Sequence, residues 1–200
     1  DVQIAEKILR FPLLGEHIAG TWNLKLTREF DMTNDSHLFR IEPGPGRLPL
    51  YEGKMIHQFD AHFAEPRYWV DEQEGRRALL GKVLDVGQKL DYQRYRVTHR
   101  AIARNTDSRT MIAAVLPCNS FYGHSLNADA GHNTDTSTLF ITAILNSLIF
   151  DFGLRQRVSA NLTLFFIYQM PAPRLLESDA GFSSVVSAAA RLICTTPDFD

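Results

Sequence analysis

The sequence is poor in cysteine, and the little it has lacks metal-binding or redox spacing. Cys118 and Cys194 are its only two cysteines, and they form no Cys-x-x-Cys pair. Two distant thiols exclude a disulfide scaffold and a cysteine zinc site, and they are typical of a reducing compartment. The chain also begins without a secretory signal pattern, and no apolar run is long enough to cross a bilayer. We therefore predict a cytoplasmic protein with no metal site and no membrane partner.

An excess of charge of one sign is also absent. The chain has 21 Lys and Arg against 23 Asp and Glu, which gives a net charge of −2. This balance excludes a domain that binds nucleic acid through overall basicity, so any anion-binding function must come from a local patch. Hydrophobic residues make up 44% and charged residues 22% of the chain, which is ordinary for a globular protein able to bury a core.

Several catalytic motifs are missing as well. No Gly-x-Gly-x-x-Gly follows a strand, and there is no phosphate-loop lysine motif, no Gly-x-Ser-x-Gly and no zinc-deaminase pattern. These absences argue against dinucleotide binding, nucleotide hydrolysis and serine hydrolase chemistry. The Asn-Pro-Pro-aromatic tetrapeptide, with which adenine methyltransferases hold their target amino group, is absent too. We therefore predict no catalytic residue and no cofactor within this chain.

What the sequence does contain is an unusual arginine pattern between Tyr92 and Pro117. Apolar or neutral side chains fall on odd positions and arginines on even ones. The odd set is Tyr95, Val97, His99, Ala101 and Ala103, and the even set is Arg94, Arg96, Arg100 and Arg104. Because successive side chains of a strand point to opposite faces, this alternation predicts a strand with all four guanidinium groups on one face.

The same stretch predicts a hairpin. Turn-forming residues fill Asn105–Ser108, and a second apolar run follows over residues 110–116. A four-residue turn places Arg104 opposite Arg109, and because like charges repel across a ladder, this arrangement predicts a nearby anion. Guanidinium groups fit phosphate oxygens and guanine edges. The alternative is a solvated face, or pairing of these arginines with the chain's own carboxylates, such as Asp60 and Asp151.

Hydrophobic periodicity predicts the remaining elements. They are a short helix over residues 2–9, strands over 22–26 and 38–41, a polar connection over 127–135, one buried apolar helix over 137–152, a strand or extended segment over 158–167, and a final helix over 183–194. Together they indicate a mixed α/β (α+β) domain with a twisted, largely antiparallel sheet, a buried apolar helix and flanking helices. We expect residues 1–20 to form a linker helix and residues 21–200 to form the domain.

The region after residue 34 leaves several alternatives open. Asp35 with the Glu52-x-Lys54 pair is the residue set that metal-dependent nucleases use, in which acids hold a metal and lysine assists the attacking water. A metal site made of His57, Asp60 and His62 is disfavoured, because positions 57 and 62 share neither a strand face nor a helix face. Aromatic residues between 63 and 70, beside an arginine, fit either base stacking or packing.

Three blocks of the chain resemble large restriction-modification enzymes. They are Leu50–Asp60 (LYEGKMIHQFD), Tyr95–Pro117, and a C-terminal group in three pieces, Leu145–Asp151, Arg155–Ser159 and Gln169–Pro173. The blocks occur here in the same order as in that family. They resemble the TaqI-like C-terminal specificity domain, a target recognition domain that follows an adenine-specific DNA methyltransferase domain in type II enzymes.

The resemblance implies a domain that reads a DNA sequence and presents an adenine for base flipping. Its implied partners are double-stranded DNA and an upstream methyltransferase domain, to which residues 1–20 connect and which holds the methyl donor S-adenosylmethionine. Phosphate contacts position such a protein and base contacts specify its sequence. The residues we expect to contact DNA are Arg94, Arg96, Arg100, Arg104, Arg109, Lys54, His57, Gln58, Asn105, Asp107 and His124. The alternatives are the nuclease and a structural domain that docks a protein partner.

Overall fold

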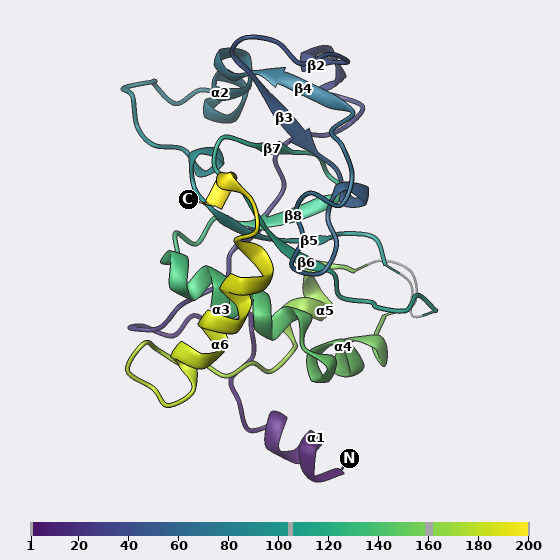
Figure 1. Cartoon of the computed structure of the whole chain (residues 1–200), viewed down its shortest axis with the longest axis vertical. Coiled ribbons are helices and arrows are strands. Elements are labelled where there is room, and N and C mark those ends of the chain that lie inside the picture. The colour runs from purple at the N-terminus through teal and green to yellow at the C-terminus, as the bar shows by residue number, and fades with distance from the viewer. Residues whose placement is uncertain (1, 104–105, 159–161, 200) are drawn as a thin grey trace.

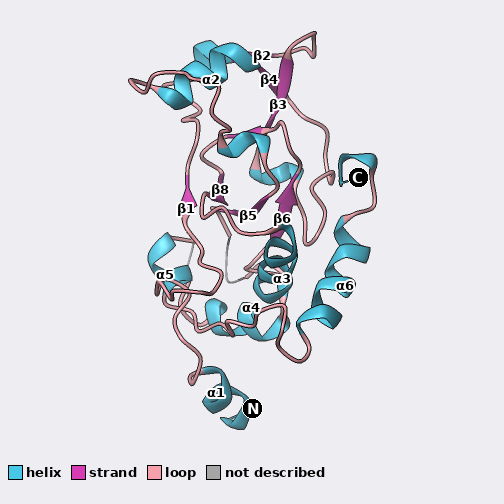
Figure 2. Ribbon diagram, turned by 90° about the vertical axis from the view of Figure 1, so that its left-hand side faces the viewer, coloured by secondary structure: helices cyan, strands magenta, loops and turns pink. Residues whose placement is uncertain are grey.

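Two β-sheets are stacked above a layer of helices (Figure 1). The structure is a computed structural model that describes residues 2–103, 106–158 and 162–199. One sheet lies at the top of this view and the second crosses the middle, while most of the helices lie below. The same order of layers is visible from the side (Figure 2). The mixed α/β class predicted from the sequence is confirmed.

The middle sheet is antiparallel throughout, with the strand order β1-β8-β5-β6. Its strands are β1 (Leu26–Thr27), β5 (Arg96–Arg100), β6 (Ala113–Leu116) and β8 (Leu126–Asp129). Val97 pairs with Val115 on one side of β5, and His99 pairs with Asn127 on the other. The predicted hairpin is therefore confirmed, although its strands are shorter and their connection, residues 101–112, is longer than expected.

The upper sheet has the order β2-β4-β3-β7 and contains one parallel pair, β3 with β7. Its strands are β2 (Phe39–Arg40), β3 (Arg47–Tyr51), β4 (Tyr68–Asp71) and β7 (Phe121–Tyr122). Helix α2 (Glu72–Leu80) follows β4 directly, and the Asp71 carboxylate caps it by accepting from the amides of Gln73 and Glu74. The close approach of α2 to β7 requires Gly75, because a Cβ there would lie 2.6 Å from the ring of Phe121.

The other helices are α1 (Val2–Ile8), α3 (Asp135–Asn146), α4 (Leu148–Arg155), α5 (Leu164–Tyr168) and α6 (Phe182–Ile193). Four short 3-10 turns are η1 (Ser36–Leu38), η2 (Gly53–Met55), η3 (Asp91–Gln93) and η4 (Pro197–Phe199). α3 packs against β5, β6 and α6. Residues near the start also enter the core: Leu14 is 1% exposed and its amide donates to Met170 O, so part of the predicted linker packs with the domain.

Both faces of the middle sheet are covered. On its lower face, Val97 and Ala113 join the helical residues Phe140, Ile141 and Leu145 in the largest hydrophobic cluster. On its upper face, β6 and β8 contribute to a second cluster, which also takes residues from the end of β3, from the segment after it and from β7. That cluster contains Tyr51, Met55, Ile56, Ala61, Ile112, Ala114, Leu116, Tyr122, Leu126 and Ala128. No face of this sheet is left open for a ligand.

Four sequence-based predictions of local structure were wrong. The strand predicted over residues 22–26 is present only as β1, which begins at Leu26. Asn127 and Asp129 belong to the buried strand β8 and not to a polar connection, because their side chains are hydrogen-bonded inside the fold. The single helix predicted over 137–152 is two helices, because Ser147 ends α3 and its side chain caps α4. The extended segment predicted over 158–167 contains α5 from residue 164, while residues 159–161 lie outside the described residues.

Among the described residues, no single helix is both long and apolar enough to cross a membrane. The pair α3 and α4 meets the length and composition criterion only when taken together, across a bend of 54°.

Candidate nucleic-acid interface

Strand β5 has the predicted alternation, but its arginine face is not open to solvent. Arg96 and Arg100 share the face that meets the upper cluster, whereas Val97 and His99 face the helices. Of the four arginines predicted on one face, only Arg96 and Arg100 lie in β5, where they do share a face, but that face is covered. Arg94 precedes the strand, and Arg104 lies outside the described residues. Alternation fixes which side chains share a face of the sheet, but the upper sheet covers that face here.

Arg96 is a buried structural residue. Its side chain is 3% exposed and forms an ion pair with Glu29, whose side chain is 8% exposed. Arg96 Nη2 also donates to Ser120 O, and the guanidinium lies 5.1 Å from the centroid of the Tyr122 ring. Burial raises the pKa of the Glu29 carboxyl group, while Arg96 opposes this shift. The prediction that Arg96 contacts DNA is therefore wrong, because its side chain is buried and its hydrogen bonds link the two sheets.

Arg100 and Arg94 are half-buried. Arg100 donates from Nε and Nη2 to the carbonyl oxygen of Ile56, at 3.2 and 2.6 Å, and burial lowers the pKa of its guanidinium group. Arg94 precedes β5, and its buried Nε has no hydrogen-bond partner among the described residues. Arg100 therefore fixes the chain at Ile56 and is not an exposed phosphate contact.

Arg109, in the β5–β6 connection, contacts Gln58, in the segment that follows β3. Arg109 Nη2 donates to Asn146 O, and its Nε lies 4.0 Å from Asp151 Oδ2. In the amide orientation that satisfies both of its polar atoms, Gln58 accepts from Arg109 Nη2 at 2.7 Å and from Nε at 2.9 Å. The alternative that these arginines pair internally is thus confirmed for Asp151. Arg109 joins three segments that are distant in sequence.

Two buried polar side chains hold the β5–β6 connection at its C-terminal side. Asp151 Oδ1 accepts from the amides of Thr110 and Met111, at 2.8 and 2.7 Å. The amide of Asn146 accepts from Ala113 N at 3.1 Å and donates to Ala113 O at 2.8 Å. These contacts fix the base of the connection, whereas Ile102 and Asp107 near its tip are exposed. Arg104 and Asn105, also predicted as DNA contacts, lie outside the described residues.

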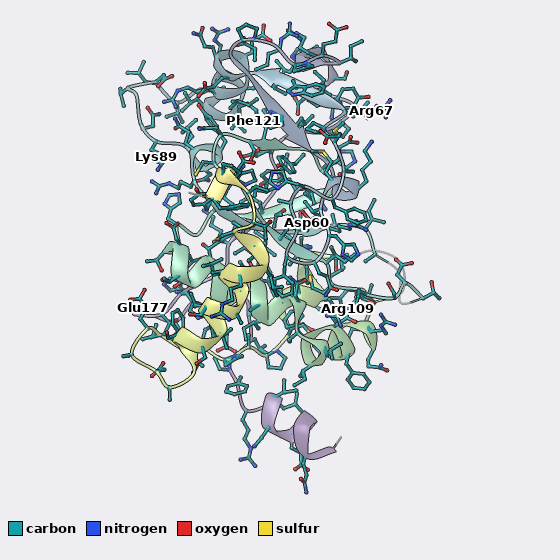
Figure 3. All side chains as sticks on the ribbon, in the orientation of Figure 1. Asp60, Arg67, Lys89, Arg109, Phe121 and Glu177 are labelled. Carbon is teal, nitrogen blue, oxygen red and sulfur yellow. The ribbon has the colours of Figure 1, made fainter. Side chains whose placement is uncertain are left out.

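A second segment, residues 53–63, lies beside this connection. Phe59 N donates to Ala113 O at 2.9 Å, and Gly53 N donates to the Ser125 hydroxyl at 2.9 Å. His57 and Asp60 form a two-way backbone bridge. We call this segment, the described part of residues 101–112, and Arg67 the loop face. Arg67 and Arg109 lie toward the right of Figure 3, away from Lys89 on the left.

The loop face contains several predicted residues with different surroundings. Lys54 is about half exposed and lies 3.2 Å from Glu52, whereas His57 is half-buried beneath the ring of Phe63. His124 is next to Ser125, but its Nδ1 accepts from Met32 N at 3.0 Å. The fold thus joins Gln58 to Arg109, and it brings Arg100 to Ile56 and into electrostatic contact with Asp107. Lys54 and His57 lie on the same segment as Gln58.

The nuclease residues do not form a metal centre. Asp35 Oδ2 accepts from Asp31 N at 2.8 Å, where it stabilises the loop before η1. Across the described ranges, no three His, Cys, Asp or Glu side chains lie close enough to hold a metal ion. The proposed set of Asp35, Glu52 and Lys54 therefore receives no support from the geometry.

Sequence reasoning missed the structural role of Glu29 and Asn146. Asn146 lies within an apolar run, which is the signal that a buried hydrogen-bonded group leaves in a sequence, whereas Glu29 stands between Arg28 and Phe30 and carries no such signal. The sequence placed His99 among the apolar or neutral residues at odd positions of the strand, but its complete burial was not predicted. Its Nδ1 lies 2.8 Å from Arg100 O, and burial lowers its pKa to about 4.

In comparisons with known proteins, no family model and no curated protein matches this chain.

Proposed function

We propose that this chain is a DNA target recognition domain that binds duplex DNA through the loop face and is not catalytic by itself. The resemblance to restriction-modification specificity domains supports this proposal. Its methyl donor, S-adenosylmethionine, then belongs to a methyltransferase domain and not to this chain. The observation that carries the proposal is that the three resembling blocks meet around the β5–β6 connection, through Phe59, Ala113, Asn146 and Asp151.

Such an arrangement suits sequence reading because it separates a rigid base from an exposed tip. Binding and recognition residues occur preferentially on loops that a rigid scaffold positions. The buried anchors reduce the conformational freedom that the connection loses when it binds. At its exposed end, a carboxylate such as Asp107 is suited to accept from the amino group of a base.

Cations at the edge of the loop face suit phosphate contacts. Lys54 and Arg67 are both exposed, and Arg67 lies 4.8 Å from the ring centroid of Tyr68. The charge of this region is otherwise balanced by Asp60 and Glu65. We therefore expect modest affinity for random DNA and a larger gain from the correct sequence.

Salt dependence of binding tests the proposal. Fluorescence anisotropy with a labelled duplex of random sequence should show affinity that falls as salt rises, by about 0.9 log units per phosphate contact for each log unit of salt. The double variant Lys54→Ala, Arg67→Ala should reduce this slope by about 2. Lys82→Ala, Lys89→Ala is the matched control, because Lys89 lies on the other side of the molecule. Binding that does not change with salt, or a control with the same effect, contradicts the proposal.

One observation favours the alternative of a domain that docks a protein. An apolar groove of about 490 Å³ lies between α1 and α4, and three of its side chains, Leu9, Leu148 and Phe152, are more than 60% exposed. This alternative is supported if the wild type binds no duplex at any salt but associates with a protein in the absence of DNA. The double variant Leu148→Ser, Phe152→Ser should then lose that association.

A further inference from the structure

Phe63 is the most exposed large aromatic side chain on the loop face. It is 57% exposed, whereas Met55, Ile56 and Ala61 of the same segment are buried, at 1%, 0% and 3%. Its ring lies 4.9 Å from the ring of His57, at an angle of 32°. One face of Phe63 is therefore covered by an imidazole and the other is open to solvent.

The backbone beside this ring is held by several hydrogen bonds. Phe63 N donates to Met55 O at 3.0 Å, and His57 N donates to Asp60 O at 2.7 Å. Arg100 holds the carbonyl of Ile56 from behind. Next to Phe63, His62 Nε2 lies 2.8 Å from Asp198 Oδ2. Because this backbone is already ordered, it has less conformational entropy to lose when a flat ligand stacks on the ring.

We propose that the open face of Phe63 is a stacking platform for an unpaired nucleobase, and this inference rests on the proposed function. The cations near it, Lys54 and Arg67, are offset by acidic side chains, so the segment is not a basic groove that follows a phosphate backbone. These acidic residues are Glu52, Asp60, Glu65 and Asp198. What it offers is a flat aromatic surface, with carboxylates that are suited to accept from base amino groups.

The ligand must be an unpaired base because of the geometry of duplex DNA. Inside a duplex each base is covered on both faces by its neighbours, so none has a face available for Phe63. A base that has left the stack, at a mismatch or after rotation out of the helix, has such a face. Stacking of one base on an aromatic side chain contributes enough free energy to change affinity about 5- to 150-fold.

The test compares three labelled probes: a matched duplex, the same duplex with one unpaired central adenine, and a single strand. The full chain should bind the probe with the unpaired base more tightly than the matched duplex. Phe63→Ala should lose about 5- to 150-fold of its affinity for the unpaired base, and it should retain salt-dependent binding to the matched duplex. Phe63→Trp, which keeps a stacking face, should restore the preference.

Phe152→Ala is the matched control, since Phe152 is 65% exposed on α4 but lies in the groove beside α1. A fluorescent adenine analogue at the unpaired position gives a second readout, because its emission should be quenched by the wild type and not by Phe63→Ala. If Phe63→Ala binds all probes as the wild type does, the platform is wrong while DNA recognition stands. If the wild type binds no probe, both proposals are wrong.

Discussion

The buried ion pair between Arg96 and Glu29 should be the most sensitive polar contact in the fold. Arg96→Met keeps the aliphatic volume of the side chain but removes the guanidinium group. Glu29 is then left without its cation, although Oε2 still accepts from Tyr122 N at 3.0 Å. Removing one partner of a buried ion pair costs about 3–5 kcal/mol, because the other charge stays buried and uncompensated. This is a large part of the stability of an ordinary domain, which is about 5–15 kcal/mol.

The pH dependence of this loss identifies its cause. Burial already raises the pKa of Glu29, and without Arg96 the pKa should rise further. A carboxyl group with a raised pKa in the folded state favours folding below its unfolded pKa, and this contribution is lost as pH rises through the folded pKa. Arg96→Met should therefore be most destabilised at neutral pH, and it should approach the wild type as pH falls to the ordinary carboxyl pKa of 4.5.

Urea denaturation of the wild type and variant at both pH values measures this difference. Comparing the two proteins at each pH cancels the other titrating groups that they share. The double variant Glu29→Met, Arg96→Met should recover most of the stability, because a matched apolar pair carries no desolvated charge. A loss below about 1 kcal/mol, the typical limit for an exposed pair, would refute the reasoning. So would an equal loss at both pH values, or a double variant as unstable as the single one.

Three further predictions concern the loop anchor, a buried histidine and the contact of α2. Asp151→Ala should cost about 1–3 kcal/mol, because two buried amides lose their acceptor, and hydrogen exchange should speed up at Thr110 and Met111 more than in β8. Burial lowers the pKa of His99 from 6.5 to about 4, so the unfolded chain takes up this proton first, and the free energy of unfolding should be constant above about pH 6.5 and fall below it. His99→Leu should flatten this part of the stability profile. An unchanged profile would contradict the prediction. Gly75→Ala should cost about 1–3 kcal/mol through the contact with Phe121, whereas Ala78→Gly, on the exposed side of α2, should cost no more than about 1 kcal/mol in thermal unfolding.

Local sequence patterns predicted most of the elements that have one dominant period. The β5–β6 hairpin, α1 and α6 follow from alternation or from helical spacing alone. β8 was missed because Asn127 and Asp129 are polar, and their burial depends on partners such as Arg28, Lys25 and Asn133 elsewhere in the chain. The bend at Ser147 was missed because a capping serine inside an apolar run does not disturb the hydrophobic pattern.

The sequence predicted candidate residues but not how the fold arranges them. Gln58 and Arg109, which are 51 residues apart, contact each other, and no pattern in the sequence indicated this contact. The fate of Arg96 could not be read from the sequence, because alternation says nothing about which layer will cover a face. A glutamate 67 residues away determines whether this arginine faces solvent or the core.

Asp151 and Asn146 hold the C-terminal side of the β5–β6 connection through hydrogen bonds to backbone atoms. These bonds do not depend on which side chains the connection carries. Asp151 holds the amides of residues 110 and 111, and Asn146 holds both backbone groups of residue 113. Every amino acid except proline has the same backbone N–H and C=O groups and can form these hydrogen bonds. These contacts therefore do not depend on the side chains at 102 and 106–108, and a different tip grafted onto this base should keep the hydrogen bonds at residues 110, 111 and 113.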